Sequence, residues 1–357
     1  MRVIVPVAVI LCVGAGVFSG AQAPSTDAST ILAAAREALG GEQKLAAVKN
    51  FVARGRTRQV RGDNLVPIEF EIACELPGRY VRRDEIPAQE SGPTSSGFNG
   101  DSLIQLPPPE PPPQAATPGG TARSVPAAGA APQAVSAGAA PPARVPDAAG
   151  ADRPAGPSGP APALPDPRKA RVTSIKQDFV KLTLGMFATS FDSYPLTFAR
   201  AGQAEAPQGT ADIVDVKGSG TFALKYFINS QTHLPIMVSW TMPATNVVLS
   251  APGQPAPGNL APGTVVVQAP APPGPTAAKD EQDKYAKDLQ ELRKKALAGA
   301  KPIEYRIYYS DYREVGNGLK FPFRLRRAIA GETVEETNFD EFKVNTRIDP
   351  RRFDALK

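Results

Sequence analysis

Residues 66–76, VPIEFEIACEL, contain the clearest strand signal in the sequence. Apolar side chains occupy every second position from Val66 to Leu76, and three of the positions between them are glutamates. A period of two with one apolar and one acidic face is typical of an antiparallel strand that is buried on one side. Cys74 falls on the apolar side, so we expect a buried, inert thiol rather than a reactive or intermolecular one. Pro77-Gly78 then predicts a turn.

Alternating patterns continue on both sides of this strand. In residues 51–60, Arg54, Arg56 and Arg58 share one face, which favours a solvated surface, with a phosphate-facing stripe as the alternative. A turn and a short strand are expected within residues 97–105. The other predicted strands are 79–86, 194–200, 211–217, 221–229, 235–242, 302–313, 319–330 and 333–344.

Three segments have helical patterns. Residues 28–48 predict two short helices separated by Gly40-Gly41, because glycine tolerates the conformation that ends a helix. Residues 169–187 carry an apolar stripe at helical spacing, which favours a helix packed on a sheet over one lying on a membrane surface. Residues 279–298 predict a charged helix with a narrow apolar stripe, either lightly docked on the body or binding a partner.

Two segments lack the composition of a folded core. Residues 107–168 contain 18 prolines and no aromatic residue, and residues 245–278 are rich in proline, glycine and alanine and carry no charge. Such segments bury too little apolar surface to offset the entropy lost on ordering. We therefore expect two long disordered inserts within the domain.

The first 23 residues resemble a secretory signal peptide. Arg2 supplies the positive start, an apolar run follows, and Ala21-Gln22-Ala23 matches a cleavage site. The run is shorter than the ~20 residues that span a bilayer, which leaves an uncleaved anchor as the alternative. We expect cleavage after Ala23 and a periplasmic or secreted protein.

Charge and residue types exclude several functions. The formal net charge of +5 is too small for a nucleic-acid binder, although it is compatible with peripheral contact with an anionic membrane. The one histidine, His233, lies in a turn, and the chain has no G-x-S-x-G elbow, P-loop or dinucleotide fingerprint. One histidine and one mature cysteine do not make a zinc site. We expect no enzyme, metal or cofactor, with a carboxylate pair from distant strands as the remaining catalytic alternative.

The order of motifs resembles a known superfamily. Leu39-Gly40-Gly41 follows an alanine-rich helix, and the C-terminal part contains SDYR at 310–313, GLKFP at 318–322, FKVN at 342–345 and IDPRRF at 348–353. Together these resemble the periplasmic LolA/LolB-like outer-membrane lipoprotein-sorting proteins. The resemblance covers roughly 26–105, 169–244 and 300–354. The long Pro/Ala inserts depart from the pattern, and no match to the family's cavity-gating arginine is found.

This resemblance implies an α+β fold, an incomplete antiparallel β-barrel with N-terminal and inserted helices. Residues 24–357 would form a single LolA-like half-barrel domain, interrupted by the inserts 107–168 and 245–278 and the charged helix 279–298. It further implies a concave apolar face that holds acyl chains.

The expected function is therefore non-catalytic binding of a lipid or lipoprotein acyl chain. The candidate lining residues on apolar strand faces are Phe70, Ile72, Trp240, Phe323 and Leu325, for which an ordinary core position is the competing interpretation. The alternative function is an envelope-associated module that binds a protein partner, with a filled core and no lipid. An open apolar cavity on the order of several hundred Å³ would distinguish the two.

Overall fold

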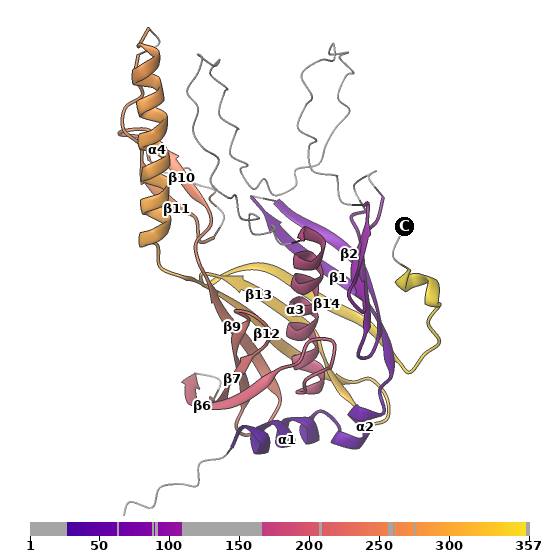
Figure 1. Ribbon diagram of the computed structural model, residues 1–357. Helices are drawn as coiled ribbons and strands as arrows, with labels where there is room; N and C mark the ends of the chain where they lie inside the picture. The colour runs from indigo at the N-terminus through magenta and orange to yellow at the C-terminus, as the bar shows by residue number, and fades with distance from the viewer. Residues whose placement is uncertain are drawn as a thin grey trace, which may run out of the picture.

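The computed structural model describes residues 27–354 except 63, 88, 90–91, 109–165, 207–208, 256–259, 261 and 275. The signal peptide expected at 1–23 lies outside the described residues, as does most of the first expected insert. Figure 1 shows one curved sheet with a helix along its concave side and further helices at its margins.

The sheet has twelve antiparallel strands in the order β5-β4-β3-β2-β1-β14-β13-β12-β9-β8-β7-β6. Because β5 and β6 remain at the two edges, the sheet does not close on itself, and the half-barrel expectation is confirmed at this level. The strands are β1 (Asn50–Arg61), β2 (Asn64–Glu75), β3 (Arg79–Glu85), β4 (Thr94–Asn99), β5 (Ser102–Leu106), β6 (Thr197–Ala206), β7 (Gly209–Lys217), β8 (Ala223–Asn229), β9 (Pro235–Met242), β12 (Ile303–Glu314), β13 (Lys320–Ile329) and β14 (Glu332–Val344).

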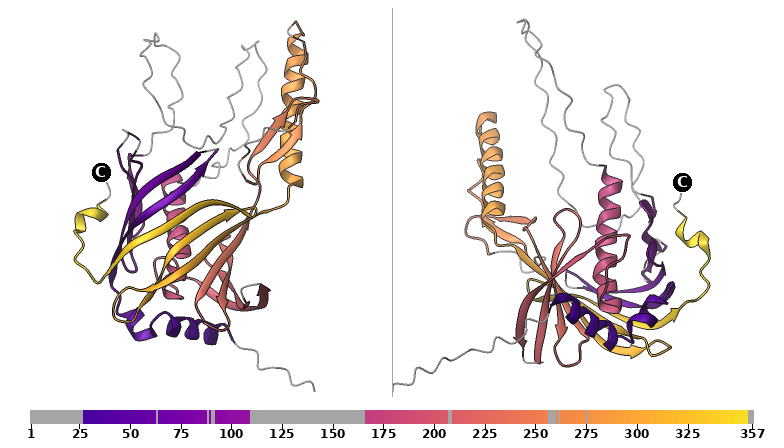
Figure 2. Two further views of the ribbon diagram at one scale, coloured as in Figure 1. Left: turned by 180° about the vertical axis from the view of Figure 1, so that it is seen from behind. Right: turned by 60° about the horizontal axis from the view of Figure 1, so that its bottom comes forward.

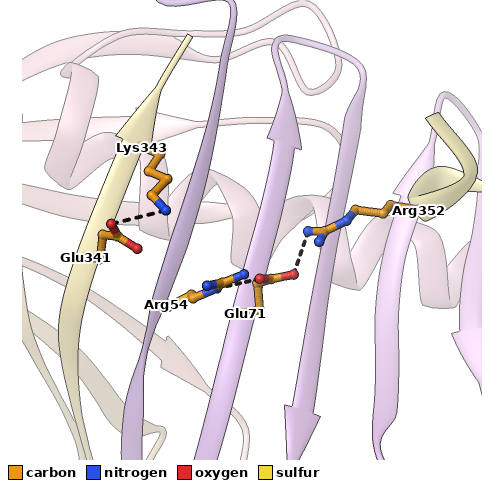
Figure 3. Close-up of polar contacts among 5 residues, drawn as sticks. All are labelled: Arg54, Glu71, Glu341, Lys343 and Arg352. Atoms are coloured by element: carbon orange, nitrogen blue, oxygen red, sulfur yellow. Dashed lines mark hydrogen bonds and ion pairs between the residues drawn. The ribbon is translucent and has the colours of Figure 1, made fainter. Parts of the chain in front are cut away.

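Alternation along β1 and β2 separates the two faces of the sheet. Ala53 pairs with Ile72 on the buried side, whereas Arg54 pairs with Glu71 on the outer side at 2.6 Å. Arg352, from the short helix η1 (Pro350–Phe353), also contacts Glu71 (Figure 3). Arg56 pairs with Asp340 at 3.2 Å. The arginines at these positions thus form a solvated, carboxylate-paired surface, as the alternation favoured.

Two short helices, α1 (Ala28–Ala38) and α2 (Glu42–Ala46), lie at one end of the sheet (Figure 1). Gly40 joins them at a φ of +127°, and a Cβ at this position would lie 2.6 Å from the carbonyl oxygen of Gly318. Lys320 N–H donates to the carbonyl of Leu39 at 2.8 Å. Two motifs separated by almost the whole chain, 39–41 and 318–322, are therefore in contact.

Helix α3 (Pro167–Phe187) lies in the concavity, where its C-terminal half is buried. The hydroxyls of Tyr309, Tyr226 and Tyr312 donate to three carbonyls near the end of the helix, those of residues 181, 184 and 185. The packing of this helix on the sheet is confirmed. Its start at Pro167 corrects the predicted limit of the first insert, because proline is tolerated in a first turn and Asp166 caps it.

An arm projects beyond the sheet (Figures 1 and 2). It contains β10 (Val247–Ser250) and β11 (Val265–Gln268), paired in parallel, and α4 (Lys279–Gly299). The expectation that 245–278 is wholly disordered is wrong at these two strands. Each strand contains a short aliphatic run, and the two runs pair with each other beside α4. Helix α4 matches the predicted charged helix and has no buried residue, as expected for light docking.

The buried face of β2 predicts the behaviour of Cys74. Its side chain is 0 % exposed, and burial raises the pKa of the thiol well above its ordinary value. We expect the native protein to react with Ellman's reagent at least about 100-fold more slowly than the urea-unfolded protein, because thiolate and access are both lacking. Rapid labelling of folded protein would contradict the inert assignment.

Candidate functional site

The five residues predicted to line a ligand site do not gather at one place. Phe70 and Phe323 are 5 % and 9 % exposed and pack edge-on against Phe339 and Phe342, with ring centroids 5.4 and 5.2 Å apart. Both therefore sit in the aromatic core. Only Ile72 and Leu325 border a cavity under α3.

Trp240 does not line that cavity, although it contacts Lys181, a residue that does. Its indole stacks on Tyr305 at 5.5 Å, and the ammonium of Lys181 sits 4.5 Å from the ring centroid. It borders a second hollow of about 340 Å³ over β7, β8 and β9, where the ion pair Asp215–Lys225 spans 3.0 Å.

The cavity under α3 has a volume of about 210 Å³. It lies between the middle of the helix and strands β2, β3, β4, β12, β13 and β14. Its apolar lining consists of Ile72, Ile175, Leu182, Ile307, Leu325 and Phe339, and its polar lining of Tyr80, Arg82, Asp84, Ser96, Asp178, Lys181, Arg327, Glu335 and Thr337. The cavity is thus amphipathic, with three cationic and three anionic side chains beside an apolar wall.

Arg82 organises one side of this polar lining. Its Nε donates to Asp84 at 2.7 Å and its Nη2 donates to the hydroxyl of Thr57 at 3.2 Å. The Thr57 hydroxyl in turn forms a hydrogen bond with the hydroxyl of Thr337 at 2.9 Å. The guanidinium also lies 4.5 Å from the ring centroid of Phe70. Burial lowers the pKa of Arg82, but the attraction of Asp84, together with that of Tyr80 and Glu335, outweighs burial and raises this pKa overall. This arginine is satisfied within the protein.

The helix side of the cavity carries a second internal pair. Lys181 donates to Asp178 at 2.9 Å, and the Asp178 side chain is 57 % exposed, so the cavity reaches solvent beside α3. Tyr80 faces the cavity from β3, and burial raises the pKa of its hydroxyl, which therefore stays protonated.

Sequence reasoning missed Arg82, Arg327 and Glu335. A signal was present on β3, where Arg82 and Asp84 share the face of Tyr80 by strand alternation. Charged residues on an otherwise apolar face mark a polar lining, and the same test applied to β13 would have selected Arg327, which shares the face of Leu325.

Metal-binding clusters and membrane-spanning helices are both absent from the described part of the chain. There, no three His, Cys, Asp or Glu side chains lie close enough together to bind a metal ion. None of the described helices combines the length and apolar character needed to cross a bilayer.

No family model matches this sequence, and no curated protein matches it. Several solved structures do. The chain is similar to LolA-superfamily proteins. One, from Nitrosomonas europaea, is 10 % identical, with 93 % of this chain and 98 % of that chain covered and a TM-score of 0.42.

Two further similar structures were found. One is a putative outer membrane lipoprotein-sorting protein domain from Vibrio parahaemolyticus: 8 % identity, 91 % of this chain, 97 % of that chain, TM-score 0.41. The other is a DUF1329 family protein from Desulfovibrio piger. It is 6 % identical, with 92 % of this chain and 97 % of that chain covered and a TM-score of 0.37. The family that the sequence motifs resemble is thus also found among these structures. At such low similarity the function must be argued from the site itself.

Proposed function

We propose that this protein is an exported, non-catalytic binder that holds one acyl chain in the cavity between α3 and the sheet. The observation that carries the proposal is the apolar wall of that cavity, contributed by both helix and sheet and open to solvent beside Asp178. Transfer of a chain from water to such a wall gains about 0.8 kcal/mol for each buried CH₂. The signal-peptide pattern of residues 1–23 supports export.

The size of the cavity limits what it holds. About 210 Å³ is below the roughly 300–1,000 Å³ of a site that encloses a drug-sized ligand. Near the end of α3 the space between helix and sheet is filled, because Phe187 of the helix packs with Phe51 and Phe321 of the sheet, and Phe321 packs with Phe342. A single chain, partly enclosed, therefore fits this site better than the several chains of a lipoprotein.

The arm favours a second function. Helix α4 buries none of its residues, and within the described part of the chain the two-stranded β10–β11 sheet has a free edge on each strand. An exposed strand edge offers unpaired backbone groups to an extended partner segment. Docking of an envelope protein on this arm is the alternative, and it requires no lipid.

A volume-filling substitution tests the lipid proposal. Leu182→Trp is expected to weaken binding of a single-chain monoacylglycerol at least about tenfold, because the indole occupies space that the chain needs. Leu297→Trp on α4 is the matched control and should bind like the wild type. Native mass spectrometry of the mature full chain, with lipid extraction of the same sample, measures both.

Lipid-free wild-type protein that stays lipid-free after incubation would rule out the acyl-chain function and leave protein docking as the better account. Equal binding by Leu182→Trp and the wild type would place the chain elsewhere on the molecule.

A further inference from the structure

Four of the six charged side chains in the cavity neutralise one another. Arg82 pairs with Asp84, and Lys181 pairs with Asp178. Arg327 and Glu335 remain without an ion pair among the described residues, although Glu335 lies close enough to Arg82 to contribute to the raised pKa of that guanidinium. Among the described residues Arg327 forms no hydrogen bond or ion pair, and Glu335 accepts one long hydrogen bond, from Gln59 at 3.4 Å.

These two residues are direct cross-strand partners that nevertheless do not pair with each other. Arg327 on β13 lies opposite Glu335 on β14, where opposite charges usually attract. The register shifts between Arg327 and Ala328, and no ion pair joins the two side chains within the described residues. On the outer face of the same two strands, Arg324 and Glu336 do pair, at 3.0 Å.

Holding two unpaired charges in a half-buried cavity costs free energy that a ligand of matching charge regains. Both side chains are half-buried and border the same amphipathic cavity as Leu325. The matching ligand carries an anionic group for the guanidinium, a cationic group for the carboxylate, and an alkyl chain for the apolar wall. A guanidinium binds phosphate with two parallel hydrogen bonds, and a carboxylate accepts hydrogen bonds from a primary ammonium.

We infer that this cavity recognises the polar head group of its ligand as well as the acyl chain. This inference rests on the proposed function. The ligand class is a zwitterionic phospholipid with a primary ammonium, a phosphoethanolamine, whose phosphate binds Arg327 and whose ammonium binds Glu335. A choline head matches the phosphate requirement but has no N–H to donate, so the site discriminates between the two heads.

Three single-chain probes with the same acyl chain test this inference: lysophosphatidylethanolamine, lysophosphatidylcholine and monoacylglycerol. We expect the wild type to bind the ethanolamine lipid about tenfold more tightly than the choline lipid, equivalent to about 1.4 kcal/mol. Glu335→Gln should remove that difference. Arg327→Gln should lower binding of both phospholipids to the level of monoacylglycerol.

Outer-face variants of the same strands, Arg324→Gln and Glu336→Gln, are the matched controls and should retain the wild-type order of affinities. Thermal unfolding verifies that each variant is folded, which we expect because neither cavity residue has a strong partner to lose. If the wild type binds all three probes equally and Leu182→Trp blocks all three, the head is not recognised and the inference is overturned, while the acyl-chain function stands. If none of the probes binds, both the head-group inference and the acyl-chain function are overturned.

Discussion

Gly185→Ala is expected to destabilise the protein by about 1–3 kcal/mol, the usual cost of overpacking a filled core. A Cβ at residue 185 would lie 2.5 Å from Cδ1 of Tyr309, well inside the contact distance of two carbons. Helix propensity alone predicts the opposite sign, because alanine is favoured over glycine inside a helix by about 1 kcal/mol. The sign of the effect therefore reports whether α3 packs directly on β12.

The tyrosine ring has little freedom to move away. Its hydroxyl donates to the carbonyl of Lys181 one turn earlier on the same helix, and the Tyr309 side chain is 3 % exposed. An added methyl group would push the helix off the sheet and break this hydrogen bond. Because the middle of α3 also lines the cavity, the variant should bind monoacylglycerol more weakly as well.

Urea unfolding measures the effect, with Gly299→Ala as the control. Gly299 also lies in a helix, at the end of α4, and a Cβ there meets nothing within 4 Å. We expect the control to change stability by less than about 1 kcal/mol. A Gly185→Ala protein as stable as the wild type would mean that α3 sits further from β12 than the contact distances indicate.

The strands and helices were largely predictable because each carries its own periodic signal. In β2 the alternation from Val66 to Leu76 placed both the strand and its buried face, and the stripe from Val172 to Met186 placed α3. The hairpin β4–β5 was harder. A glycine-containing turn at Asn99–Ser102 joins two strands of six and five residues, so the sequence showed one turn and one strand.

The β10–β11 sheet was not predictable from composition. The average composition of residues 245–278 is dominated by proline, glycine and alanine, so two aliphatic runs of three residues each do not stand out. In addition, a parallel strand needs a partner far along the chain. No local pattern links Val247 to Val265. Their pairing depends on the connection between them and on α4, which a window-based argument does not include.

The candidate site was predictable only in part. Strand alternation identifies which side chains face inward, and in this respect Ile72 and Leu325 resemble Phe70 and Phe323. The two pairs differ in their surroundings. Helix α3 leaves space beside Ile72 and Leu325, whereas aromatic rings fill the space around Phe70 and Phe323. That difference is tertiary and is not encoded in the period of any one strand.

Phe321→Ala is expected to destabilise the protein by about 3–5 kcal/mol, the usual cost of removing a buried phenylalanine ring. Phe321 is 0 % exposed, and its ring meets Phe187 of α3 at 5.3 Å and Phe342 of β14 at 5.4 Å. Its loss leaves a void between helix and sheet at the centre of the aromatic core. Such a void is expensive because the surrounding rings relax only partly.

Leu325→Ala, four residues further along β13 on the same face, provides the comparison. Leu325 is partly exposed and already borders the cavity, so its truncation enlarges an existing space and should cost less than about 2 kcal/mol. Urea unfolding of the two variants and the wild type gives both values. Equal losses would place Leu325 in the core and argue against a ligand-binding wall. A large loss of stability for Phe321→Ala with a small loss for Leu325→Ala is the result expected if a rigid aromatic core has a binding cavity at its margin.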